Sequence, residues 1–155
     1  MDDNRYAPPK AVVDDAPHGT QAAPPLWNPN AAASWCLLFT PIFGALLHMK
    51  NWQALGEPER ANAARSWLLA AIVVLVGSTL VALFAPRVPG VRLLNFAFLI
   101  AWYYASAKPQ AGYVLARFGK DYPRRGWLAP ILAAIGAIVA YVVVLGILVA
   151  AIGLA

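Results

Sequence analysis

The chain has 155 residues, of which 61% are hydrophobic and only 12% are charged. Soluble domains carry about 25% charged residues, so this composition excludes a typical soluble domain and indicates one small membrane-embedded bundle. The net charge is +5. Because the basic residues flank apolar runs, their expected partners are the lipid bilayer and its anionic headgroups. Nucleic acid is not expected as a partner.

Residues 1–30 hold six of the thirteen prolines and show no apolar periodicity. A segment of this composition cannot bury enough apolar surface to offset the entropy cost of ordering it. We therefore predict a disordered Pro-rich tail over 1–30 and a helical membrane domain over 31–155.

The first apolar segment, 31–49, is interrupted by Thr40-Pro41. Pro41 lacks a backbone donor and disfavours helical geometry at the residue before it. The sequence predicts a helix break at Pro41, two short helices and a membrane hairpin over 31–56. One kinked crossing by 31–49 is the alternative, and it would raise the number of spanning helices from three to four.

Three later runs have the length and apolarity that a bilayer crossing requires. They predict spans at about 66–85, 91–107 and 127–150. The first belongs to a helix that begins at Pro58, an allowed first-turn position. Together with the hairpin, these runs predict an all-α polytopic membrane protein.

Pro109 is expected to end the second span and to open a separate helix over 109–118. Apolar residues recur there at helical spacing, which predicts a helix lying in the membrane interface. The residues of this apolar face are Ala111, Val114, Leu115 and Phe118.

Lys and Arg favour the cytoplasmic side in short loops. Their distribution predicts that loops 50–66 and 108–126 are cytoplasmic and that the C-terminus is periplasmic. The side of the N-terminal tail depends on whether 31–49 spans or re-enters.

Basic and aromatic residues gather around the second of these loops. They are candidate lipid-headgroup contacts, either as ordinary positive-inside anchoring or as a specific lipid site. These candidates are Lys108, Arg117, Lys120, Arg124, Arg125 and Trp127.

The last helix carries small residues at nearly regular spacing, which lets helices approach closely. This candidate packing face suits either another chain or the same chain. It consists of Ala129, Ala133, Gly136, Ala137 and Ala140.

No paired carboxylates, nucleophile–base pair, phosphate loop or Cys/His cluster is present in the sequence. We expect no enzyme activity, no cofactor, no catalytic residues and no metal site. His48 is expected at headgroup depth. The leading hypothesis is a non-enzymatic accessory component of the membrane. Its partner would be either further copies of the same chain, in a homo-oligomer, or another membrane protein. The alternative is a small oligomeric transporter or channel built around Asn95, Tyr103 and the break at Pro41.

Two short stretches resemble segments of other membrane proteins and so indicate a cellular location. Asn4 to Ala11 resembles the N-P-Y-A-P-P-x-A opening of small uncharacterised proteobacterial membrane proteins, with Arg5 where a proline is usual. The stretch from Phe39 to Gly56 resembles a pattern in such proteins, an apolar Pro/Gly turn followed by Asn-x-x-Ala-Leu-Gly. The resemblance implies the bacterial inner membrane and no known activity.

Overall fold

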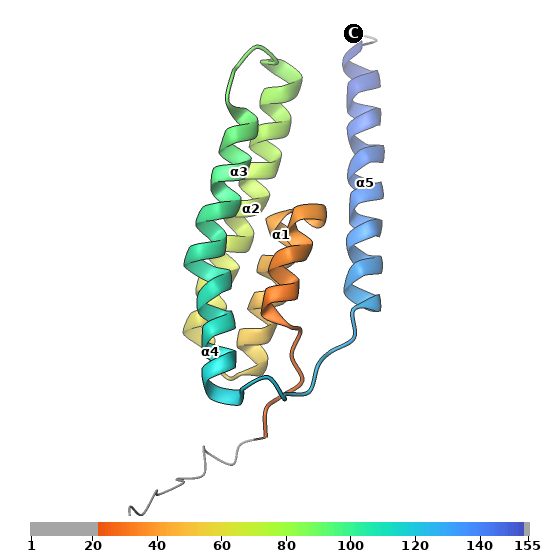
Figure 1. The fold of residues 1–155 in the computed structure, drawn as a ribbon. Helices are drawn as coiled ribbons and strands as arrows, with labels where there is room; N and C mark the ends of the chain where they lie inside the picture. The colour runs from red at the N-terminus through yellow and green to blue at the C-terminus, as the bar shows by residue number, and fades with distance from the viewer. Residues whose placement is uncertain (1–21, 154–155) are drawn as a thin grey trace, which may run out of the picture.

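The computed structural model describes residues 22–153, so the predictions for residues 1–21 lie outside the described range. The described part is helical, as predicted. Its elements are α1 (Pro29–Ala54), α2 (Pro58–Phe84), α3 (Val91–Trp102), the π-helical turn η1 (Tyr103–Ala107), α4 (Lys108–Phe118) and α5 (Leu128–Gly153). Figure 1 shows α1 beside α2 and α3, with α5 standing at its other side.

Helix α1 is a hairpin. Its N-terminus is capped by Asn28, whose side chain accepts hydrogen bonds from the backbone N–H groups of Asn30 and Ala31. At Thr40 the backbone leaves helical geometry, with φ 72° and ψ 162°, and the chain turns back (Figure 1). The two ends of α1 meet, since His48 Nε2 lies 3.3 Å from the Pro29 carbonyl oxygen. The predicted Pro-broken hairpin is confirmed, and the four-span alternative is wrong.

The two arms of α1 pack closely because a glycine lies where they meet the third helix. A Cβ atom on Gly44 would overlap the Cys36 sulfur and lie 2.6 Å from Cη2 of Trp102. Cys36, Ala45, Trp102 and Ala107 form a buried cluster at this contact. Gly44 therefore allows the second arm, the first arm and α3 to share one packing point.

Helix α2 begins at Pro58, as predicted, and Gly56 (φ 71°) separates it from α1. It packs along the hairpin through Ala61, Ala64 and Ala71, which are buried. Alanines allow this close approach because their side chains add little bulk.

The structure differs from the predicted stop before Pro109. Helices α3 and α4 follow each other through η1, and Figure 1 shows residues 91–118 as one continuous rod. Within the turn, the Lys108 N–H bonds to the Tyr103 carbonyl, five residues back. A proline ring clashes with the carbonyl of an ordinary helical turn, and one wider turn gives Pro109 room without ending the helix. The segment 109–118, predicted as a separate interfacial helix, is thus the end of the 91–118 rod.

Helix α5 has no buried residue. It meets the hairpin through Ala134, which packs with Trp127, the residue before α5, against Ala32, Phe43 and Leu47. Further along α5, toward its C-terminus, the Tyr141 hydroxyl forms a hydrogen bond with the Thr79 hydroxyl of α2. These contacts leave most of the α5 surface uncovered by the rest of the described chain.

Residues 22–28 are part of the fold, which shortens the predicted disordered tail at its C-terminal side. Leu26 is fully buried. Its N–H donates to the Pro123 carbonyl at 3.0 Å, and its carbonyl accepts from the Arg125 N–H at 2.9 Å. The segment before α1 therefore pairs with the linker that leads into α5.

Three helices are long and apolar enough to cross a membrane: α1, α2 and α5. Since α1 is folded back at Thr40, its arms enter from one end of the bundle and return to it (Figure 1). Many large apolar side chains of α2, α3 and α5 are exposed on the surface, which is the outer surface expected of a membrane protein.

Candidate functional site at the polar end of the bundle

The described chain concentrates its buried polar side chains at one place, where the open end of the hairpin meets α4. Asn51 and Gln110 are 1% and 0% exposed. Asn51 Nδ2 donates to the Trp27 carbonyl at 2.8 Å and to Gln110 Oε1 at 3.3 Å, while Asn51 Oδ1 accepts from the Trp27 N–H at 3.0 Å. Gln110 Nε2 donates to the His48 carbonyl at 2.8 Å. These bonds tie three segments distant in sequence, and we call Asn51, Gln110 and His48 the amide node.

His48 is fully buried within the described chain. The Pro29 carbonyl can only accept a hydrogen bond, so Nε2 carries the ring hydrogen in this contact. Its other ring nitrogen, Nδ1, and the Trp102 Nε1 are buried without a hydrogen-bond partner among residues 22–153, and the two rings meet edge to face at 5.5 Å. His48 therefore serves as a buried connector between the hairpin and α3.

A second cluster, which we call the guanidinium clamp, lies next to the node and consists of Glu57, Arg60, Tyr113 and Arg117. The Tyr113 hydroxyl donates to Glu57 Oε1 at 2.5 Å and accepts from Arg117 Nη1 at 2.6 Å. Both guanidinium groups approach the Glu57 carboxylate to 3.9 Å. The clamp carries two positive charges against one negative charge.

Arg60 is also held by aromatic rings. Its guanidinium carbon lies 4.4 Å from the centre of the Tyr113 ring and 5.0 Å from that of Trp52, and the two rings meet edge to face. Such cation–π contacts contribute about 0.5–2 kcal/mol each, depending on exposure. They fix the position of the guanidinium at the mouth of a cavity.

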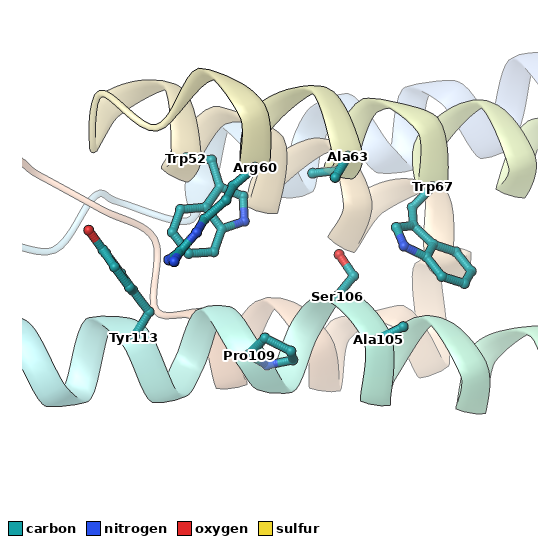
Figure 2. Close-up of a pocket in the computed structure, with 9 residues that line it drawn as sticks. Trp52, Arg60, Ala63, Trp67, Ala105, Ser106, Pro109 and Tyr113 are labelled. Atoms are coloured by element: carbon teal, nitrogen blue, oxygen red, sulfur yellow. The ribbon is translucent and has the colours of Figure 1, made fainter.

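The cavity lies between α2 and the 91–118 rod and has a volume of about 410 Å³. Figure 2 shows Arg60, Trp52 and Tyr113 at one end of it and Trp67 at the other, with the Ser106 hydroxyl directed into the space between the helices. Ser106 belongs to the π-helical turn. The cavity thus has one charged end and one apolar end.

The structure separates the predicted headgroup contacts into three groups. Arg117 belongs to the guanidinium clamp, and Lys108 lies over the Tyr104 ring at 5.2 Å. Arg125 lies over the Trp27 ring at 4.7 Å, and the Trp27 indole donates to the Gly126 carbonyl. The remaining predicted contacts, Lys120, Arg124 and Trp127, lie on or next to this same linker. These residues share one end of the molecule and do not form one pocket.

On the linker, Arg124 lies over the Tyr122 ring at 5.6 Å. Burial raises the pKa of the Tyr122 hydroxyl above its usual value, and the nearby Arg124 charge acts in the opposite direction. The hydroxyl therefore stays neutral at physiological pH.

The predicted small-residue face of α5 is exposed. None of its residues is buried; they are Ala129, Ala133, Gly136, Ala137 and Ala140. The hairpin instead contacts Ala134 of α5 and Trp127 just before it. At about 100° per residue, Ala129, Ala133, Gly136 and Ala140 lie about 100–160° around the helix from Ala134, and Ala137 lies about 60° from it. Packing within the described chain, which the sequence left open, is not the use of this face.

The residues of the transporter alternative are only partly brought together. Asn95 and Pro41 line the same cavity, of about 370 Å³, at the tip of the hairpin. Tyr103 lines a different cavity, beside the first arm. Within residues 22–153, no group of three or more His, Cys, Asp or Glu side chains could hold a metal ion.

Sequence reasoning missed the amide node, Trp102 and the guanidinium clamp. One signal was available for the node: Trp102, Gln110 and Val114 recur at nearly helical spacing, and all three are buried. The expected apolar face of 109–118 included Leu115, which is 54% exposed. The glutamine was not recognised as a member of the packing face.

Comparisons of this chain with protein-family models, with curated proteins and with solved structures gave no match.

Proposed function

We propose that this is a non-enzymatic membrane protein that acts by binding a second transmembrane protein through α5. The observation that carries the proposal is that α5 has no buried residue, while the other helices pack around the hairpin. Helices inside a bilayer associate through close packing of small residues rather than through the hydrophobic effect. The exposed stripe of Ala129, Ala133, Gly136 and Ala140 is of this kind.

The partner that fits best is a second copy of the same chain. A two-fold interface uses the same patch on both subunits and must be self-complementary. A smooth, uncharged stripe on a straight helix meets that requirement, because two identical stripes can lie against each other without clash or unpaired charge.

We also propose that the protein resides in the bacterial inner membrane with its polar end in the cytoplasm. In support, the basic residues of 50–66 and 108–126 lie at one end of the bundle, and α5 runs from that end to the opposite one (Figure 1). The two basic residues of the opposite end are Arg87 and Arg92. This distribution agrees with the positive-inside rule.

Cysteine crosslinking in membranes tests the proposal. The only native thiol, Cys36, is buried, so Ala133→Cys adds one accessible thiol on the stripe. Ile135→Cys is the control: it is 46% exposed, lies at nearly the same depth and points away from the stripe. We expect a crosslinked dimer for Ala133→Cys and little for Ile135→Cys.

An adduct of another mass with Ala133→Cys would replace the second copy by a different partner. Equal crosslinking of both variants, or none from Ala133→Cys, would contradict a specific role for this face.

A further inference from the structure

We propose that the cavity between α2 and the 91–118 rod binds one anionic phospholipid, with the lipid phosphate on Arg60. This site is separate from the α5 face and does not depend on the proposed partner. It also differs from the basic residues expected from the sequence, which did not include Arg60.

The first argument is the state of the Arg60 guanidinium. This group carries five N–H donors in its plane, and its carbon lies over the Trp52 and Tyr113 rings while no side-chain hydrogen bond from it to another residue of 22–153 is present. Its Nε lies 3.9 Å from Glu57 Oε2, which is longer than a hydrogen bond. Arg60 is therefore held in place as a charge, with donors still available to an oxyanion.

The second argument is charge. Arg60 and Arg117 both lie at the Glu57 carboxylate, so the guanidinium clamp has an excess of one positive charge, and Arg60 is its charged member that lines the cavity. A guanidinium fork matches the geometry of a phosphate group better than an ammonium does. The excess favours a lipid with net negative charge over a zwitterionic lipid.

The third argument is the shape of the lining. Beyond Arg60, the cavity continues along α2 past Ala63 and Ala64 to Trp67, opposite Ala105. Arg60 and Trp67 are about 10 Å apart along the helix axis at 1.5 Å per residue. A phospholipid has the same order, a charged phosphate followed by glycerol and acyl chains, and the Ser106 hydroxyl lies between the two ends (Figure 2).

The fourth argument is depth. Residues 66–84 of α2 are uncharged, and their length of about 28 Å matches the hydrocarbon core of a bilayer. Arg60 then lies at headgroup depth. The flanking Trp52, Trp67 and Tyr113 are residues enriched at that level.

The test is native mass spectrometry of the full chain extracted from vesicles of phosphatidylglycerol and phosphatidylcholine. We expect the wild type to retain phosphatidylglycerol, and Arg60→Gln to lower that retention about tenfold or more, as loss of hydrogen bonds to a charged group predicts. Arg65→Gln is the matched control, because it removes the same charge from an exposed site on the same helix. It should change retention less than twofold.

Ala63→Leu is a second variant that keeps every charge and fills the apolar part of the cavity. It should also lose bound phosphatidylglycerol, while thermal unfolding in phosphatidylcholine vesicles stays near that of the wild type. Inorganic phosphate is added in a separate arm, and it should not displace the lipid.

Four results would overturn the proposal. The first is an equal loss of bound phosphatidylglycerol in Arg60→Gln and Arg65→Gln, and the second is unchanged retention of that lipid in Arg60→Gln and Ala63→Leu. The third is equal retention of both lipids by the wild type, and the fourth is displacement of the bound lipid by inorganic phosphate. The last result would indicate a site for free phosphate instead of a lipid.

Discussion

Replacing Gly44 by alanine should destabilise the hairpin strongly. The new Cβ would overlap the Cys36 sulfur and lie 2.6 Å and 2.9 Å from two ring carbons of Trp102. Trp102 is fully buried and its ring meets His48, so it cannot move aside freely. Overpacking a core costs about 1–3 kcal/mol, and a rigid ring places this site near 3 kcal/mol. The better helix propensity of alanine offsets about 1 kcal/mol of that.

The net loss of about 2 kcal/mol can be measured by reversible unfolding in mixed micelles, followed by tryptophan fluorescence. Gly77→Ala is the control, since a Cβ there meets nothing within 4 Å, and it should leave stability unchanged or raise it slightly. Adding Cys36→Ala to Gly44→Ala removes the sulfur overlap and should recover part of the loss. If Gly44→Ala unfolds like the wild type, the two arms and Trp102 are not as close as this packing requires.

Two further predictions concern the amide node and the hairpin turn at Thr40. Gln110→Leu leaves the His48 carbonyl and the Asn51 amide short of a partner and should cost about 1–3 kcal/mol in the same unfolding assay. Gln53→Leu, at an exposed amide, should cost much less, and equal losses would argue against the node. Thr40→Gly should raise stability by about 1 kcal/mol, because Thr40 occupies a backbone region that essentially only glycine adopts freely. Thr40→Ala keeps the strained backbone and should give no such gain, so a similar gain from both variants would remove strain as the reason.

The features that the sequence predicted correctly depend on local chemistry. Pro41 lacks a backbone donor and disfavours helical geometry at Thr40, which is where the backbone leaves the helix. Pro58 suits the first turn of a helix in any context. Such signals depend only on residues close together in the sequence, so a single sequence is enough to interpret them.

The features that the sequence did not predict depend on contacts between distant segments. Asn51 and Gln110 bond across 59 positions, and no local pattern pairs them. Pro109 was expected to end a helix, but a single π-helical turn lets the rod continue. Arg60 was not singled out because its aromatic partners, Trp52 and Tyr113, come from two other helices.

The pairing of Leu26 with the linker before α5 has a consequence for how the protein is made. The Trp27 indole next to it bonds to Gly126, 99 positions later, so Leu26 and Trp27 leave the ribosome long before their partners exist. Closing so long a loop is slow compared with forming local helical contacts. The hairpin, α2 and the 91–118 rod can therefore assemble first, and Leu26 and Trp27 are covered only after the linker before α5 has been synthesised. Covering of the segment before α1 is thereby a late step in folding.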